Sequence, residues 1–281
     1  MAGEAHAAEA ADRQVDIIGH ILPNKDEIGN YIELPLVDPD HLLAGKIYLP
    51  EFELFGIDLS ITNHIVMMWV AAALLIVLML TAFRGTGLVP SGLANLFEAI
   101  VVFIRDVVVE PVMGEHGRVY LPYLLTAFFF ILFCNLLGLV PYSATATGNI
   151  SVTAALALCT FAITQVSGIV NNGLFGYCKS LVPSGIPLWL LPIMIPVELI
   201  SLLAKPFALC IRLFANMVAG HVAILVFLGL IIMLQSFYVA PFSVVFAAAL
   251  YLLEIFIAFI QAFIFTLLSA LFISMAAHPD H

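Results

Sequence analysis

The chain has 281 residues, of which 63% are hydrophobic and 10% are charged, and its mean hydropathy is +1.13. Soluble domains carry about 25% charged residues, so this composition excludes an ordinary soluble protein. The net charge of −10 is concentrated at one end, because twelve of the 19 acidic residues lie in the first 58 positions. The remainder has little charge, and nothing in it indicates nucleic-acid binding.

Several apolar stretches reach the roughly 20 residues that a helix needs to cross about 30 Å of hydrocarbon. A membrane β-barrel would show short segments of alternating polarity instead. The sequence therefore predicts an all-α polytopic membrane protein with about five membrane-inserted helices and one amphipathic surface helix.

The polar, proline-containing residues 1–60 are expected to form an extramembrane arm, partly extended, in which residues 37–55 could form a short hairpin. The first transmembrane segment is assigned to residues 61–84, with its helix over 65–83. Residues 85–120 form the next segment.

In that segment, apolar residues recur at helical spacing over 91–113, interrupted by charged positions. This pattern predicts a helix lying on the membrane surface, N-capped by Ser91 and followed by a loop. Residues 121–170 then read as a transmembrane hairpin, with spans at 121–140 and 150–170.

A loop at residues 171–191 precedes two abnormally long apolar runs within the segment 192–276. Residues 192–234 would be about 65 Å long as a helix, and residues 241–276 about 54 Å. Pro206 lies inside the first run, where it is expected to bend the helix rather than end it. We therefore predict two long, strongly tilted helices joined at a bend, with a short tail at residues 277–281.

Basic residues are enriched on the cytoplasmic side of membrane proteins. Arg84, Arg105 and Arg118 all fall between the first two spans, and Lys179 falls in the loop 171–191 on the same side. This distribution predicts an external N-terminus and a cytoplasmic C-terminus.

Arg212 lies in the middle of the first long run. A guanidinium stays protonated in a protein, and burying one at bilayer depth costs at least about 2.5–3.5 kcal/mol on insertion scales. On a helical wheel, Arg212 shares a narrow stripe with four other polar residues, while His221 falls on the opposite side. These four residues are Glu198, Ser201, Lys205 and Asn216.

On the second long helix, Ser243, Glu254 and Gln261 share one face. Folding the hairpin antiparallel brings His221 level with Glu254 and brings Arg212 level with Gln261. Glu198 then lies beyond the arginine, toward the cytoplasm. Two sets of protonatable groups would thus be separated by a fixed cation, which repels protons and favours the ionised form of a carboxylate on a partner.

Structural explanations for these residues stay open at this point. Arg212 could pair with Glu198, and the amide, His and Glu side chains could be ordinary interhelical hydrogen bonds. Lys205 is expected to extend its amine toward the membrane surface, and Asn135 to pack against another helix. A secondary transporter would need internal repeats and broken helices, and we find no repeat. A scaffold would show scattered polar residues rather than two sets at matching depths.

Four segments resemble subunit a of the F-type ATP synthase. They are Ile-Arg-Leu-Phe-Ala-Asn-Met-Val-Ala-Gly-His at 211–221, Glu254 with Gln-Ala-Phe-Ile-Phe at 261–265, Pro-Ile-Met-Ile-Pro-Val-Glu at 192–198 and Asn-Leu-Leu-Gly-Leu-Val-Pro at 135–141. The resemblance extends from about residue 65 to the C-terminus. It departs from the family pattern at Gly138, where some members carry an aspartate.

The resemblance implies a static subunit whose tilted hairpin lies against a rotating ring of c subunits, held by b-type peripheral stalk subunits. By position, Arg212 matches the family's essential arginine, His221 and Glu254 an outer half-channel, and Glu198 an inner one. Asn216 and Gln261 match polar neighbours of the arginine, and Ser201, Lys205, Ser243 and Asn135 are accessory candidates.

The resemblance also implies that nucleotide catalysis resides in other subunits, so we expect no catalytic residue, metal or cofactor in this chain. The protonatable pair favours H⁺ over Na⁺ as the transported ion. The implied location is a bacterial plasma membrane, with an organellar membrane as the alternative.

Overall fold

The computed structural model describes residues 62–84, 92–140, 145–180, 191–234 and 240–277, together with short strands between residues 25 and 58. Within this part of the chain, five helices are long and apolar enough to cross a membrane, as predicted. They are α3 (Asn63–Ala82), α6 (Leu121–Gly138), α7 (Ile150–Ser180), α8 (Leu191–Leu234) and α9 (Ala240–Ala277).

The N-terminal arm contains strands in addition to the all-α membrane part. β2 (Gly29–Leu34) pairs antiparallel with β3 (Gly45–Tyr48), so the hairpin begins earlier than the predicted residues 37–55. β1 (Lys25–Asp26) extends this sheet in the order β1-β2-β3, and β4 (Glu53–Leu54) pairs with β5 (Ile57–Asp58).

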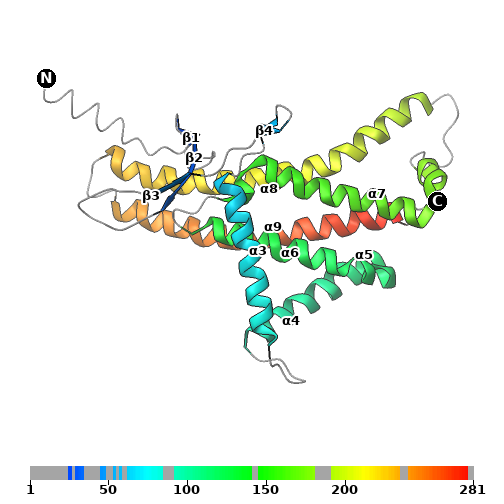
Figure 1. Ribbon diagram of the computed structural model, residues 1–281, viewed down its shortest axis with the longest axis horizontal. Helices are drawn as coiled ribbons and strands as arrows, with labels where there is room; N and C mark the ends of the chain where they lie inside the picture. Colours follow the sequence, from blue (N-terminus) through cyan, green and yellow to red (C-terminus); the bar gives the residue numbers. More distant parts are fainter. Residues whose placement is uncertain are drawn as a thin grey trace, which may run out of the picture.

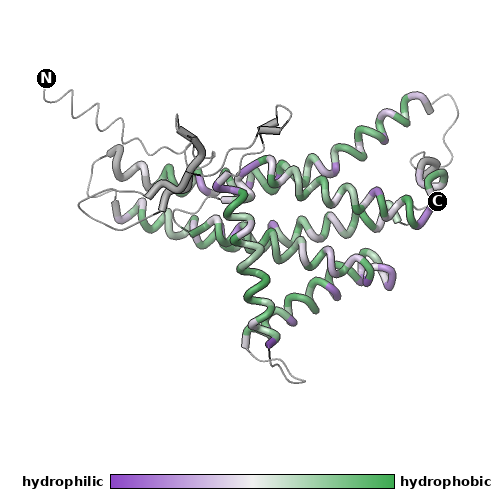
Figure 2. The backbone as a smooth tube through the Cα atoms, in the orientation of Figure 1, coloured by the Kyte–Doolittle hydropathy of each residue, from purple (hydrophilic) through white to green (hydrophobic). Residues whose placement is uncertain are grey.

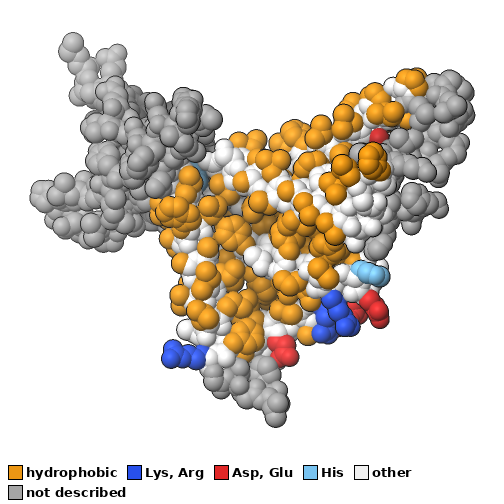
Figure 3. All heavy atoms as spheres, turned by 45° about the vertical axis from the view of Figure 1, so that its right-hand side comes forward, with side chains coloured by type: hydrophobic (Ala, Val, Ile, Leu, Met, Phe, Trp, Pro, Cys, Tyr) orange, Lys and Arg blue, Asp and Glu red, His pale blue; other side chains and the backbone are white. Residues whose placement is uncertain are grey.

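The surface segment is less regular than the single predicted helix. α4 (Leu93–Ile104) is followed by the π-helical turn η1 (Arg105–Val109), by α5 (Glu110–Met113) and by the 3₁₀ segment η2 (Gly114–Val119). Gly92, and not Ser91, occupies the N-cap position of α4. The segment buries an apolar face, while charged side chains gather at one margin of the molecule (Figure 3), as in a helix at a membrane surface.

The two long helices of the predicted hairpin are present. α8 has 44 residues and α9 has 38, and α8 remains one helix although it contains Pro196 and Pro206. The two helices lie side by side, and α3 crosses their direction steeply (Figure 1). If α3 crosses the membrane upright, α8 and α9 must therefore be strongly tilted. The bend at residues 235–239 lies outside the described residues.

α6 and α7 pack against the hairpin and form the core with it. Leu124, Ile131, Phe265 and Ile273 are fully buried in this cluster. All these helices are apolar over most of their length (Figure 2), so packing and scattered polar contacts must hold them together. Two such contacts join α6 to α7, from Tyr120 to Ser167 at 2.6 Å and from Tyr123 to Thr160 at 2.7 Å.

α7 is longer than the predicted span 150–170, since it continues to Ser180 and takes up half of the expected loop. The helix is interrupted at Gly173, whose φ of 70° and ψ of 161° are not helical. Just before this kink, the Asn172 Nδ2 donates to the carbonyls of Ala276 and Ala277 at 3.0 and 3.2 Å. These carbonyls at the end of α9 have no partner within their own helix, so the kinked segment caps α9.

Gly173 adopts a backbone conformation that is nearly restricted to glycine, which costs other residues about 1–3 kcal/mol. We expect Gly173→Ala to lower the thermal melting midpoint of the detergent-solubilised protein by roughly 2–6 °C. Gly176→Ala is the matched control, because its added Cβ meets only an ordinary contact, 3.5 Å from the Asn172 Cβ. Equal midpoints for the two variants would contradict this account of the kink.

Candidate functional site

A buried histidine and glutamate join the two long helices. The Nδ1 of His221 on α8 lies 2.8 Å from the Oε1 of Glu254 on α9. The Glu254 side chain is 3% exposed and that of His221 is 23% exposed. The contact confirms the predicted register at this level of the hairpin.

The helices approach closely at this pair because Gly220 has no side chain. A Cβ at position 220 would lie 2.5 Å from the Oε1 of Glu254 and 2.8 Å from its Cδ. The Glu254 side chain would have to shift to make room for any larger residue. The glycine before the histidine therefore allows the observed close approach of the carboxylate.

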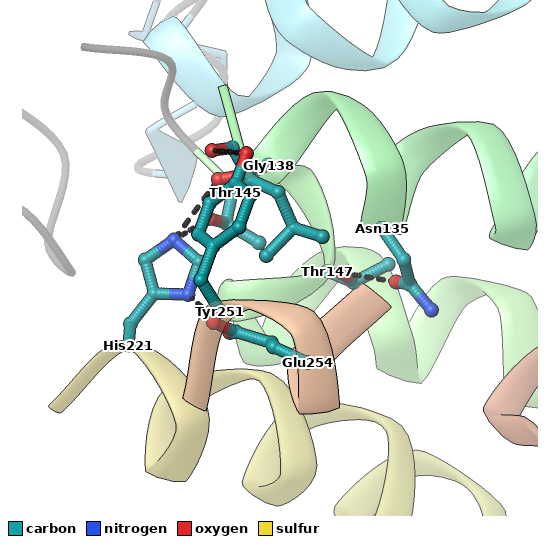
Figure 4. A network of polar contacts seen from close by, with 8 residues as sticks. Asn135, Gly138, Thr145, Thr147, His221, Tyr251 and Glu254 are labelled. Atoms are coloured by element: carbon teal, nitrogen blue, oxygen red, sulfur yellow. Dashed lines mark hydrogen bonds and ion pairs between the residues drawn. The ribbon is translucent and has the colours of Figure 1, made fainter. Parts of the chain in front are cut away.

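The turn between α6 and α7 forms a third wall of the site (Figure 4). The Nε2 of His221 donates to the carbonyl oxygen of Gly138 at 2.9 Å and lies 3.0 Å from the Oγ1 of Thr145. The Tyr251 hydroxyl donates to the Leu139 carbonyl at 3.0 Å, next to the same turn. The sequence did not indicate these partners, because no sequence pattern shows where a backbone carbonyl will point. Gly138 was noted only because some members of the resembled family have an aspartate at this position.

This geometry fixes which nitrogen of His221 can exchange a proton. Since the Gly138 carbonyl can only accept, the Nε2 carries a hydrogen. The Nδ1 then either donates to the Glu254 carboxylate or accepts from its protonated form. In both cases one proton is shared across the 2.8 Å contact. The Glu254 Oε2 is buried and has no hydrogen-bond partner among the described residues, which leaves it open to a further proton donor.

Arg212 lies on the face of α8 opposite to His221, as the helical wheel predicts. Its side chain is exposed, whereas Leu209, Leu213 and Met217 are buried against the rest of the protein. Within the described part of the chain, Arg212 makes no ion pair or hydrogen bond. The structural explanation of a pair with Glu198 is therefore wrong for this conformation.

Asn216 and Gln261 form the second polar link between α8 and α9. The Asn216 Nδ2 donates to the Gln261 Oε1 at 2.6 Å, and Gln261 is 2% exposed. The predicted partner at the level of Gln261 was Arg212, one helical turn earlier on α8. The register differs because the observed contacts pair Asn216 with Gln261, which puts Arg212 roughly opposite residues 263–265.

The remaining members of the Arg212 stripe lie toward the start of α8. Ser201 is exposed and Glu198 is half-buried. The Lys205 Nζ lies 5.7 Å from the centre of the Phe272 ring on α9, a distance suited to a cation–π contact. Glu198 precedes Arg212 by 14 residues, or about 21 Å along a helix, so these two groups are not brought together.

Two accessory candidates, Ser243 and Asn135, are buried on α9 and α6. Ser243 shares the buried face of α9 with Glu254 and Gln261, as predicted, and its fully buried Oγ has no partner among the described residues. Asn135 is 1% exposed and accepts from the Thr147 hydroxyl at 2.7 Å, within the turn after α6. Asn135 therefore holds the turn that contacts His221.

Comparison with known proteins gives one consistent family. The family described as "ATP synthase A chain" matches residues 65–274. "ATP synthase subunit a" of Chloroherpeton thalassium is 53% identical over 248 residues, covering 84% of this chain and 73% of that protein. The protein of the same name from Myxococcus xanthus is 55% identical over 237 residues, covering 80% of this chain and 77% of its own length.

A third relative extends the similarity over the N-terminal arm. "ATP synthase subunit a 2" of Chlorobaculum tepidum is 46% identical over 288 aligned residues, which cover 99% of this chain and 78% of that protein. The matched region contains all five membrane helices and every residue of the site. The chain therefore belongs to the ATP synthase subunit a family.

Proposed function

We propose that this chain is the proton-translocating stator subunit of an F-type ATP synthase, and that it loads and unloads the carboxylates of a rotating c-ring. The observation that carries the proposal is the division of α8 into two faces. His221 meets Glu254 on the buried face, while Arg212 is exposed and unpaired, within the described chain, on the other. The continuity of α8 is unlike the broken helices of a secondary transporter.

In the proposed mechanism, the buried pair belongs to an outer half-channel. A proton arriving from outside occupies the His221–Glu254 contact and is passed to a ring carboxylate. Ser243, with its buried hydroxyl, is suited to hold a water on this route. Glu198, at the other end of α8, belongs to an inner half-channel through which the proton leaves.

Arg212 separates the two half-channels electrostatically. Two like charges about 6 Å apart repel by roughly 3 kcal/mol at an effective dielectric constant near 20. Since 1.4 kcal/mol corresponds to a factor of ten, one fixed cation suppresses proton occupancy beside it by about a hundredfold. The same charge favours the ionised form of a ring carboxylate, which can then be loaded again. Asn216 and Gln261 brace the two helices beside the arginine.

The wider assembly follows from the family. We propose that the chain contacts the c-ring through the exposed face of α8, and that b-type stalk subunits hold it against rotation. Nucleotide chemistry then belongs to other subunits of the complex. The basic loops favour a cytoplasmic C-terminus and an external N-terminal arm, in a bacterial plasma membrane. The segments 85–120 and 171–191 would then face the cytoplasm.

The first test removes the charge of Arg212. We expect Arg212→Ala, measured in inverted membrane vesicles that contain the whole complex, to abolish ATP-driven proton pumping and to raise passive proton leak. Thr126→Ala is the control, because it removes an exposed hydroxyl that bonds the Pro122 carbonyl of its own helix, outside the site, without changing charge. ATP-driven pumping at the wild-type rate in Arg212→Ala would contradict the proposal.

The second test uses the close approach at Gly220. In Gly220→Ala, the new methyl group would overlap the Glu254 carboxylate, which must shift from its observed position beside His221. We expect ATP-driven pumping to fall by about tenfold or more, because a loss of 1.4 kcal/mol in the transfer step already gives that factor. Gly229→Ala on the same helix should pump normally, since its added Cβ meets nothing within 4 Å. Equal pumping by both variants would argue against a role for the pair.

The third test addresses the two half-channels and their orientation. In a protein whose four native cysteines are replaced, Ser201→Cys and Ser243→Cys are treated with a membrane-impermeant thiol reagent. We expect Ser201→Cys to react from the cytoplasmic side and Ser243→Cys from the outer side. Reaction of both from one side would overturn the proposed orientation.

A further inference from the structure

In the turn between α6 and α7, the side chain that contacts the buried pair is that of Thr145. This residue is 6% exposed and lies between the His221 ring and the start of α3 (Figure 4). Its hydroxyl and its backbone carbonyl make contacts in different directions. Thr145 thereby connects the first membrane helix to the two long ones.

The hydroxyl of Thr145 completes the surroundings of the His221 Nε2. It donates to the Gly138 carbonyl at 3.3 Å, which leaves its lone pairs facing the Nε2–H at 3.0 Å. The Nε2 hydrogen therefore lies between two oxygens, the Gly138 carbonyl at 2.9 Å and the Thr145 Oγ1. Both oxygens accept from it, so this side of the ring keeps its proton.

The backbone of Thr145 is held from the other side by His64. The His64 Nδ1 lies 3.0 Å from the Thr145 carbonyl oxygen, to which it donates. His64 is the second residue of α3 and is 1% exposed. A buried bond of this kind fixes the turn relative to α3, because breaking it would leave polar groups without partners.

The fit around Thr145 is tight. A Cβ added at Gly138 would lie 2.7 Å from the Thr145 Cγ2, 2.9 Å from its Oγ1 and 3.1 Å from the Met217 Cε. The threonine thus fills the space that a side chain at position 138 would need. Position 138 supplies a carbonyl and position 145 supplies a hydroxyl, and the two act on the same nitrogen.

We propose that Thr145, held by His64, is a positioning residue of the outer proton pathway. It retains the hydrogen on the His221 Nε2 and turns the Nδ1 toward Glu254, so that only the Nδ1 exchanges protons. This inference rests on the proposed function of the pair. It adds a residue from the α6–α7 turn and one from α3 to a pathway otherwise built from α8 and α9.

Among the described residues, few groups face His221 from each neighbouring element. α9 contributes Glu254 and the hydroxyl of Tyr251, which bonds the Leu139 carbonyl. α3 contributes His64, which acts through the Thr145 carbonyl. The α6–α7 turn contributes the uncharged Thr145 and Gly138.

The test compares Thr145→Val with Thr145→Ser in membrane vesicles that contain the whole complex. Pumping per assembled complex is measured as a function of pH. Without the hydroxyl, the Nε2 hydrogen keeps only the Gly138 carbonyl as acceptor, so the ring is held less firmly. The protonated ring is the stronger donor and loses more from this change than the neutral ring. We expect about two- to tenfold slower pumping in Thr145→Val, and a pH curve moved to lower pH. Thr145→Ser should restore both.

Thr164→Val is the matched control, since within the described residues the buried hydroxyl of Thr164 bonds only the Thr160 carbonyl of its own helix. It should leave the pH curve in place. A Thr145→Val curve that superimposes on the wild-type curve would overturn the inference.

If Thr145→Val does not assemble into the complex, a comparison of His64→Leu with His64→Gln tests the same inference. Glutamine can still donate to the Thr145 carbonyl and leucine cannot, so only His64→Leu should move the pH curve. An unmoved curve in His64→Leu would overturn the inference. Arg212→Ala, measured in parallel, distinguishes a failure of the proposed function from a failure of the inference about Thr145. If Arg212→Ala still pumps, the proposed function is wrong. If Arg212→Ala does not pump while the variants at positions 145 and 64 behave as wild type, only the inference is wrong.

Discussion

The permanent positive charge of Arg212, in an otherwise apolar hairpin, restricts which groups can lie beside it. Arg212 cannot neutralise itself, and within the described chain it is not paired. Its side chain is exposed on α8, whereas Leu209, Leu213 and Met217 are buried against the rest of the protein. The His221–Glu254 pair lies on another face of α8, where α9, the end of α6 and the turn after α6 enclose it.

The lengths along α8 agree with a moving carrier in the proposed mechanism. His221 and Glu198 are 23 residues apart, which corresponds to about 34 Å on a helix. This exceeds the roughly 30 Å of hydrocarbon, so a helix that holds both groups near opposite surfaces must tilt. Tilt displaces the two groups sideways as well as in depth. In the proposed mechanism, the ring carboxylate carries the proton over this lateral distance, past Arg212.

The sequence predicts the parts of the site that depend on helical periodicity. His221 and Glu254 each stand 13 residues from the ends of the two apolar runs, and they meet at 2.8 Å. The contacts of Thr145 and Gly138 could not be predicted, because they depend on the backbone path of a turn rather than on a repeating pattern. The kink at Gly173 was missed for a similar reason, since a glycine in a polar stretch indicates a loop as readily as an interrupted helix.

The exposed face of α8 has a consequence for how the protein is made. A copy that reaches the membrane before its partners would present Arg212 to lipid, at a cost of at least about 2.5–3.5 kcal/mol. That cost is a large fraction of the stability of a typical protein. The free subunit is thus destabilised by the group that, in the proposed mechanism, separates the two half-channels. A partner that covers this face of α8 would relieve the cost, so assembly itself would stabilise the chain.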